Sequence, residues 1–303
     1  MKAIIPVAGY GTRMRPHTDH VQKTLIPVGG KPALSHIVEP LFAAGIKKIT
    51  FIIGHLGQQV VDFMQQYDGQ FQFIEQKEML GLGHAVLQGL VNEDEEVLLQ
   101  LGDNIFDTNI DNFITSKANR IAVAKVDDPR RFGVVELDKN YIISFHEKPD
   151  NPPSNYAISG LYFLKSQIIL KNAIETLIDQ NITTKNEYQI TDAFKIMLNQ
   201  GEIFEPWECG WMDTGVPDTL LKTNKLLLNQ YGNQKKSDFI TPPVFVVNNV
   251  TMINSIIGPN VTIMDNSTIN NCHISNCVIL ENTNLSDKEL SHCVVGKNGS
   301  DIC

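Results

Sequence analysis

The sequence predicts an α/β fold in which an open, mostly parallel sheet is covered by helices and followed by a short β-helix. Strand and helix signals alternate through the first two-thirds of the chain, as such a sheet requires. One apolar run ends in a glycine-rich turn and another in Gly102-Asp103-Asn104, at the sheet edge where open α/β proteins bind ligands. Isoleucine recurs every sixth residue from Ile257, which is typical of a hexapeptide β-helix.

Apolar periodicity places the individual elements. The predicted strands are Ala3–Ala8, Lys48–Ile53, Phe71–Glu75, Glu96–Leu101, Ile121–Val126 and Ala157–Phe163. The predicted helices are Ala33–Ala44, Gln58–Tyr67, Gly83–Leu90, Ile168–Leu177, Asp192–Leu198 and Asp218–Leu228. Gly133–Leu137 and Ile142–Glu147 predict a hairpin, and Pro217 is well placed to open the last helix.

Beyond about Ser237 the composition changes, and from Val250 the chain is rich in Asn, Ser and Thr with few helix formers. Ile257, Ile263 and Ile269 are six residues apart, and the phase blurs after Ile269. The alternative is an irregular Asn-rich loop with chance periodicity. We therefore predict a main domain over residues 1–236 and a β-helical tail over 237–303.

Composition excludes several classes of function. A formal net charge of −9 argues against a nucleic-acid surface, which needs a basic face, but leaves nucleotides possible. No apolar run approaches the roughly twenty residues that span a bilayer, and the N-terminus lacks the features of a signal peptide. We expect a cytoplasmic protein with no membrane or nucleic-acid partner.

The cysteines do not predict a disulfide framework or a metal site. There are five, an odd number. Cys272, Cys277 and Cys293, with His273 and His292 nearby, lack Cys-x-x-Cys spacing. We expect them to fill core space as small, weakly polar side chains.

The turn after the first strand predicts phosphate binding. Gly9 and Gly11 lack a Cβ, so backbone N–H groups there approach a polyphosphate closely. Arg13, Arg15 and Lys23 place three cations around the same turn. The spacing is neither that of a P-loop nor that of a dinucleotide fingerprint.

Two aspartates are candidate magnesium ligands. Asp103 follows a strand, and Asp213 lies in Gly210-Trp211-Met212-Asp213-Thr214-Gly215. Mg²⁺ is commonly held by one or two carboxylates together with phosphate oxygens and water. Each aspartate, taken alone, is equally explained as a turn or capping residue.

The pattern Gly-x-Gly-Thr-Arg-Met-x-Pro-x-Thr at residues 9–18, followed by Lys23, Pro27-Val28 and Gly30-Lys31-Pro32, resembles the sugar-nucleotide pyrophosphorylases. The resemblance runs from Met1 to about Tyr231. It implies a Rossmann-like catalytic domain and a left-handed hexapeptide tail, too short for the full acetyltransferase domain of bifunctional relatives. The implied reaction joins a sugar 1-phosphate to a nucleotide and releases pyrophosphate.

The resemblance also implies roles for residues in the matching motifs. Arg13 would hold the β- and γ-phosphates, Lys23 would neutralise the α-phosphate, and Asp103 and Asp213 would bind Mg²⁺. The implied nucleotide-binding residues are Ala8, Gly9, Gly11, Thr12, Arg13, Gln76, Gly81 and Asp103. The implied sugar-phosphate residues are Gly133, Glu147, Lys148, Asn155, Gly160 and Glu187. For Glu187, capping of the helix near Thr191 is nearly as good an explanation, and His84 is expected to pack near the nucleotide rather than to catalyse.

The expected substrates are dTTP or UTP and a sugar 1-phosphate, with glucose 1-phosphate first. Glu75-Gln76 and Leu80-Gly81-Leu82-Gly83-His84-Ala85 resemble pyrimidine-reading rather than guanylyl-transferring relatives. The alternatives are a catalytically silent regulatory subunit that binds nucleotide sugars, and a cytidylyltransferase acting on a small phosphorylated alcohol. The open end of a short β-helix favours a homo-oligomer, a dimer or a tetramer.

Overall fold

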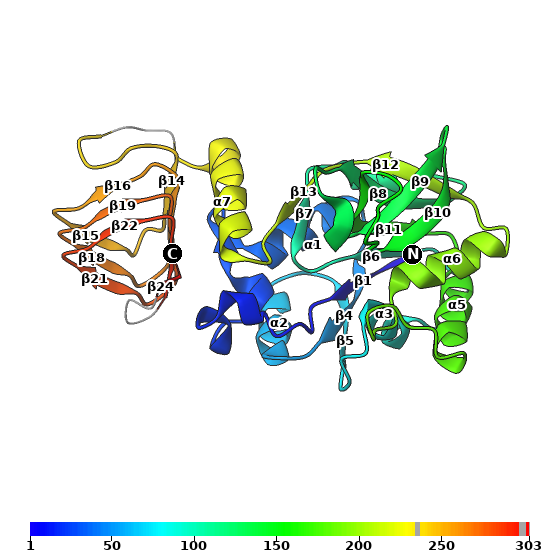
Figure 1. Ribbon diagram of the computed structural model, residues 1–303. Coiled ribbons are helices and arrows are strands. Elements are labelled where there is room, and N and C mark those ends of the chain that lie inside the picture. Colours follow the sequence, from blue (N-terminus) through cyan, green and yellow to red (C-terminus); the bar gives the residue numbers. More distant parts are fainter. Residues whose placement is uncertain (234–236, 297–300, 303) are drawn as a thin grey trace. The chain divides into compact units, whose positions relative to one another are not determined.

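The computed structural model describes residues 1–233, 237–296 and 301–302 (Figure 1). The chain forms two compact units, each made of two separate stretches. Unit 1 comprises Met1–Gly9 and Val38–Trp211, and unit 2 comprises Tyr10–Ile37 and Met212–Cys303. This division groups the glycine-rich segment with the tail, whereas the boundary after residue 236 follows composition alone and stays a prediction.

Unit 1 is built on a nine-stranded sheet in the order β10-β9-β11-β6-β1-β4-β5, with β8 pairing with β11 and β12. Its strands are β1 (Lys2–Pro6), β4 (Lys48–Ile53), β5 (Gln70–Glu75), β6 (Val97–Gln100), β8 (Asn119–Lys125), β9 (Gly133–Asp138), β10 (Tyr141–Glu147), β11 (Tyr156–Leu164) and β12 (Phe204–Glu208). Strands β6, β1, β4 and β5 are parallel, and β11 runs antiparallel to β6. The predicted α/β sheet is confirmed, and so is the hairpin of β9 and β10.

Helices cover both faces of the sheet. They are α1 (Ala33–Ala43), α2 (Gly57–Met64), α3 (Leu82–Gly89), α4 (Ile110–Ile114), α5 (Gln167–Asp179) and α6 (Ile190–Asn199). The main core joins α3, α5 and α6 to sheet residues such as Ile4 and Leu99. On the other face, aromatic rings of α1, α2, β4 and β5 pack together, with Phe42 and Tyr67 stacked at 5.5 Å. Successive side chains of a strand point to opposite faces of the sheet. The apolar strands therefore present apolar side chains to the helices on both faces.

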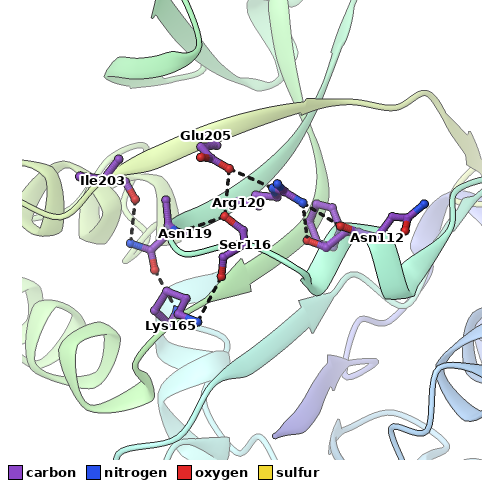
Figure 2. Close-up of polar contacts among 9 residues, drawn as sticks. Asn112, Ser116, Asn119, Arg120, Lys165, Ile203 and Glu205 are labelled. Carbon is purple, nitrogen blue, oxygen red and sulfur yellow. Dashed lines mark hydrogen bonds and ion pairs between the residues drawn. The ribbon is translucent and has the colours of Figure 1, made fainter.

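The sequence did not predict β12, because Pro206 lies inside it and proline cannot donate to a sheet ladder. The strand tolerates this proline because it pairs only with β8, at an edge. Figure 2 shows the polar network that ties β12 to the start of β8. Arg120 donates to Glu205 at 3.1 Å and to the carbonyl of Asn112 at 2.7 Å, and Lys165 donates its N–H to Asn119 at 2.9 Å.

This network lies at the amino end of β8 and β12. It is therefore at the edge of the sheet opposite the carboxyl ends of β1 and β6, and its role is structural.

Unit 2 contains α7 (Pro217–Tyr231), which Pro217 opens as predicted, and the β-helix. Three parallel sheets make the sides of the β-helix: β14-β17-β20-β23, β15-β18-β21 and β16-β19-β22, with β24 pairing antiparallel to β23 (Figure 1). The strands are β14 (Val244–Val246), β15 (Thr251–Ile253), β16 (Ile256–Ile257), β17 (Val261–Ile263), β18 (Thr268–Asn270), β19 (His273–Ser275), β20 (Val278–Ile279), β21 (Asn284–Ser286), β22 (Glu289–Ser291), β23 (Val294–Val295) and β24 (Asp301–Ile302). The predicted β-helix is confirmed, and its hand stays a prediction. The short strands outside these sheets are β2 (Pro27–Val28), β3 (Lys31–Pro32), β7 (Asn104–Phe106) and β13 (Trp211–Asp213).

The repeat of the β-helix is not a strict hexapeptide. Ile257 pairs with Ile274, seventeen residues later, and Ile263 pairs with Ile279, sixteen residues later. A side of the coil therefore has either five or six residues, which explains why the phase blurs after Ile269. The inward residues remain buried throughout, at Ile257, Ile263, Ile269, Ile274, Ile279, Leu285 and Val295.

The Asn-rich composition follows from the corners of the coil. A residue with positive φ stands at each corner, at Asn254, Asn260, Asn266, Asn271, Asn276, Asn282, Asp287 and His292. Asn and Asp adopt this left-handed conformation more readily than other residues with a side chain. The corner residues and the inward aliphatic residues are separated by the same steps of five or six residues, so both series follow the same irregular repeat.

The three described cysteines of the tail, Cys272, Cys277 and Cys293, are buried. Cys272 and Cys277 are free and fill core space, as predicted. Cys293 is disulfide-bonded, so the expectation of a simple core residue is wrong there. Within the described part of the chain, no group of three or more His, Cys, Asp or Glu is placed to hold a metal. No described helix has the length and apolar character needed to cross a bilayer.

Candidate active site

The glycine-rich turn brings the loop residues of unit 2 together. Gly11 has a φ of +62°, and a Cβ on it would lie 2.9 Å from the Thr18 methyl and 3.2 Å from the Cβ of Lys23. The Thr18 hydroxyl donates to the Gly11 carbonyl at 2.9 Å. Gly11 therefore lets the chain pass close to the stem of Lys23, as a shared phosphate site requires.

The three cations of this segment are held differently. Arg13 lies in a 3₁₀ turn, Thr12–Met14, and both Thr12 and Arg13 are exposed. Lys23 opens a second turn, Lys23–Leu25, which the Gln22 side chain caps by accepting the Thr24 N–H at 2.6 Å. Arg15 pairs with Asp19 at 3.1 Å, so its charge is offset. The expectation that all three cations surround a phosphate stays a prediction.

In unit 1, the end of β1 approaches the loop after β4. Ala8 is buried, and a Cβ on Gly54 would lie 2.5 Å from its carbonyl oxygen. Gly9 is exposed, with open space where a Cβ would stand. These two residues lie at the carboxyl edge of the parallel strands, where the sequence predicted nucleotide contacts.

Gly81 and Glu187, placed in different predicted subsites, are neighbours. A Cβ on Gly81 would lie 2.8 Å from the Cβ of Glu187, and the Tyr188 N–H donates to the Leu80 carbonyl at 2.8 Å. The side chain of Glu187 accepts from Gln189 at 2.7 Å. Helix α6 has Gln189 as its N-cap with no side-chain capping bond, so Glu187 does not cap it.

Gln76 and His84 frame the same loop. Gln76 is buried directly after β5, and its amide donates to the Glu78 carbonyl at 3.1 Å. Its amide oxygen and second N–H have the chemistry that reads a pyrimidine edge. His84 lies in the first turn of α3, as predicted, and its buried Nδ1 has no hydrogen-bond partner in the described structure.

Asp103 and Gly160 lie where β6 and β11 pass each other. The Leu101 N–H donates to the Gly160 carbonyl at 2.9 Å, and Asn104 donates to the Ser159 carbonyl at 2.7 Å. Gly160 has a φ of +96°, and a Cβ there would lie 2.6 Å from the Leu101 side chain. This close approach fixes the turn on which Asp103 stands.

Glu147 is the most firmly held acidic side chain among the candidates, at 7% exposure. Thr191 donates to its Oε2 at 2.8 Å, and the Lys148 ammonium lies 3.4 Å from its Oε1. A Cβ on Gly133 would lie 3.2 Å from the same Oε2. Burial, and to a lesser degree the charge of Glu147, raises the pKa of Tyr162. The carboxylate is therefore oriented by Thr191 and lies against the backbone of Gly133, which has no side chain.

Asn155 is not part of this cluster. Its side chain is exposed, and its carbonyl accepts from Val126 at 3.0 Å as part of the pairing of β8 with β11. Its predicted sugar role stays a prediction.

Asp213 belongs to unit 2. One of its carboxylate oxygens accepts the Gly215 N–H at 2.6 Å, and Thr223 of α7 donates to its carbonyl at 2.9 Å. Each of the two aspartates, Asp103 in unit 1 and Asp213 in unit 2, offers the carboxylate oxygens that Mg²⁺ prefers, and their shared metal role stays a prediction.

Four buried polar atoms lack a hydrogen-bond partner in the described structure: His84 Nδ1, Gln100 Oε1, Ser159 Oγ and Asp192 Oδ2. Each lies close in sequence to a residue of the site, respectively Gly81, Asp103, Gly160 and Thr191. Thr191 and Asp192 were not predicted as site residues, although Ile190-Thr191-Asp192 at a helix start was the available signal.

Comparison with known proteins gives the family to which the chain belongs. The family model described as nucleotidyl transferase matches residues 2–230, and the chain belongs to this family.

Among curated relatives, the chain is 35% identical over 238 residues to the bifunctional protein GlmU of Methanocaldococcus jannaschii, covering 78% of this chain and 56% of that protein. It thus spans little more than half the length of that relative. It is 31% identical to the UTP–glucose-1-phosphate uridylyltransferase AglF of Haloferax volcanii, covering 72% of this chain and 93% of that one. A solved structure assigned as a glucose-1-phosphate thymidylyltransferase of Bacillus anthracis, with sucrose bound, is 29% identical with a TM-score of 0.65, covering 75% of this chain and 95% of that chain.

Proposed function

We propose that this chain transfers a nucleotidyl group from dTTP or UTP to a sugar 1-phosphate, with glucose 1-phosphate the first candidate. The observation that carries the proposal is the cluster of Glu147, Lys148 and Thr191 beside Gly133. An oriented carboxylate binds sugar hydroxyls, and the adjacent ammonium binds a phosphate. The names of the uridylyl- and thymidylyl-transferring relatives support the same substrates.

The reaction forms one bond and breaks one. An oxygen of the sugar phosphate attacks the α-phosphorus, and the bond from that phosphorus to the β-phosphate oxygen breaks as pyrophosphate leaves with the electron pair. No general base is needed, because the attacking phosphate is already ionised. Catalysis therefore consists of alignment and neutralisation of charge.

The charged residues of the chain divide this work. Arg13 holds the β- and γ-phosphates of the leaving group, and Lys23 stabilises the charge that builds at the α-phosphate. Asp103 and Asp213 would supply carboxylate oxygens to Mg²⁺, and the ion would screen the repulsion between the two anionic substrates. Gln76 and Gly81 hold the edge of the base, whose identity as thymine or uracil depends on small contacts.

Release of pyrophosphate from four nucleoside triphosphates with several sugar phosphates tests the proposal. We expect turnover with dTTP or UTP, loss of activity in EDTA and recovery with Mg²⁺. Lys23→Ala and Asp103→Asn should each lower kcat about 100-fold. Lys47→Ala, at a surface lysine paired with Asp68, is the matched control and should leave kcat unchanged.

The outcomes separate the alternatives. Undiminished turnover in both Lys23→Ala and Asp103→Asn would show that the assignment of these residues is wrong. Tight binding of a nucleotide sugar without turnover by the wild type would identify a regulatory subunit. Preference for CTP with a phosphorylated alcohol would identify a cytidylyltransferase.

We also propose that the chain forms a dimer or a tetramer. The first coil of the β-helix exposes Ile253 and Ile256, and Phe239 precedes it at 61% exposure. β14 and β16 are bridged to Asn233 and Ile240, whereas β15 is the first strand of its sheet and has an outer edge that invites pairing. Light scattering on size-exclusion peaks should give a multiple of 33.8 kDa, and a monomer at micromolar concentration would contradict this.

A further inference from the structure

One outer face of the β-helix is covered by the segment that carries Arg13 and Lys23. Val278 and Val294 flank the inward residues of β20 and β23, so alternation points them away from the coil interior, yet both are fully buried. They pack with Met14 and Ile26 of the segment and with Leu220 of α7 in one apolar cluster. All of these residues belong to unit 2.

A buried hydrogen bond joins the first half of the segment to the coil. Nε2 of His17 lies 2.9 Å from the carbonyl oxygen of Val294, and the imidazole is 4% exposed. Because a carbonyl only accepts, Nε2 must carry the proton and donate it. The bond holds the chain four residues after Arg13.

A second buried connection holds the hairpin of β2 and β3, six residues after Lys23. Oδ1 of Asn224, on α7, accepts the Gly29 N–H at 2.9 Å and the Thr262 hydroxyl of β17 at 2.7 Å. Its Nδ2 donates to the Asn260 carbonyl at 3.3 Å. Asn224 and Thr262 are fully buried, so the loss of either partner leaves a polar group unsatisfied.

The glycines of this hairpin fit the same contact. A Cβ on Gly29 would lie 2.5 Å from the Cβ of Leu227 in α7. A Cβ on Gly30 would lie 2.5 Å from the ring of Phe245 in β14. The hairpin thus packs against α7 and the first coil with no space for a side chain.

We infer that the β-helix is a positioning element of the triphosphate site: it holds residues 14–30 in place through His17, Asn224 and Thr262. These three are positioning residues, because they act through the segment and not on substrate. The inference rests on the proposed function only for the statement that this segment binds triphosphate. The connection between tail and segment is tested without it.

The first test measures hydrogen exchange of peptides from residues 10–30 in the full chain without nucleotide. Thr262→Val removes a donor to Asn224, and His17→Phe removes the donor to Val294. Each should speed exchange in this segment about fivefold, as expected for the loss of one buried hydrogen bond. His17→Gln keeps a donor and should restore slow exchange.

Thr283→Val is the matched control. Thr283 is also a fully buried threonine of the β-helix, but its hydroxyl donates to the Leu280 carbonyl of the coil at 2.7 Å. It should leave exchange of residues 10–30 unchanged. Equal exchange in Thr262→Val, His17→Phe and wild type would overturn the inference, as would an equal increase in Thr283→Val.

The second test compares kinetics. Thr262→Val and His17→Phe should raise KM for the triphosphate about fivefold, with KM for the sugar phosphate unchanged and Thr283→Val like wild type. A parallel rise of both KM values would show a general structural effect and overturn the positioning role. A wild type that makes no nucleotide sugar would refute the proposed function, and hydrogen exchange would then decide the inference.

Discussion

Thr191 shows what a single hydroxyl contributes to the sugar-phosphate cluster. Glu147 lies at the end of β10 and Thr191 at the start of α6, and the 2.8 Å bond between them fixes the carboxylate toward Gly133. A hydrogen bond to a charged group stabilises by about 1.5–3 kcal/mol. The orientation of Glu147 therefore depends on a residue forty-four positions away in the chain.

We predict that Thr191→Val raises KM for the sugar phosphate about tenfold, since 1.4 kcal/mol corresponds to that factor. Valine has the same shape and lacks the donor. KM for the triphosphate should stay constant, and Thr191→Ser should retain wild-type KM values. Steady-state kinetics with each substrate varied in turn measures this, and an unchanged KM for the sugar phosphate would remove Thr191 from the site.

The residues predicted from the sequence were those that stand in continuous motifs. Glu147-Lys148, Gly11 with Lys23, and Asp103 are recognisable because the chain order preserves their neighbours. Thr191 was missed because its bond to Glu147 joins a helix and a strand that are distant in sequence. The pairing of Arg15 with Asp19 was not predicted, because it depends on the local fold.

At the scale of the element, the corners of the β-helix explain why the tail is rich in asparagine, a composition that otherwise resembles that of a disordered segment. Asn282 has a φ of +58°, and its N–H donates to the Asp265 carbonyl at 2.9 Å. For a residue with a Cβ, this left-handed conformation costs about 1–2 kcal/mol of conformational free energy, whereas glycine adopts it without that cost. The phase of the isoleucines blurred in the sequence because the first coil takes seventeen residues and the following coils take sixteen, so the sides have either five or six residues.

We predict that Asn282→Val lowers the free energy of unfolding by about 2 kcal/mol, whereas Asn282→Gly changes it by only a few tenths. Asn284→Val is the control, because Asn284 is an exposed residue of β21 where a β-branched side chain fits. Urea unfolding monitored by circular dichroism gives the three values. Equal losses at positions 282 and 284 would contradict the role of the corner.

The buried thiol of Cys277 predicts a pH dependence. Burial raises its pKa to about 11 from the ordinary value of 9.0. Above pH 9 the unfolded thiol loses its proton while the folded one keeps it, so the free energy of unfolding falls as pH rises from about 9 to about 11. Two pKa units correspond to roughly 3 kcal/mol.

The comparison with Cys277→Ala isolates this effect from other groups that titrate in the same range. The variant starts less stable, because a buried side chain is shortened, but its stability should fall less steeply between pH 9 and 11. Denaturant unfolding at several pH values measures both slopes. Identical slopes would show that Cys277 titrates normally in the folded protein.

At the scale of the whole molecule, the chain is interleaved: it leaves unit 1 after Gly9, returns at Val38 and leaves again after Trp211. We predicted a domain boundary after residue 236 from the change in amino-acid composition along the sequence. Composition carries no information about the packing of Tyr10–Ile37 with a tail that begins two hundred residues later. The fold class was predictable from local periodicity, whereas this grouping depends on contacts that no local pattern encodes.

We therefore predict that a chain ending at residue 236 is unstable even though it contains every candidate active-site residue. Truncation would uncover Met14, Ile26 and Leu220, all fully buried in the intact chain. Exposing three such side chains costs about 5 kcal/mol, comparable with the whole stability of many proteins. The truncated chain should bind a hydrophobic dye, aggregate on size exclusion and unfold at a lower Tm than the full chain, with near-UV circular dichroism reporting the loss of packing. A soluble 1–236 chain with an unchanged Tm would instead show that the tail folds as a separate domain, and that the N-terminal segment does not need it.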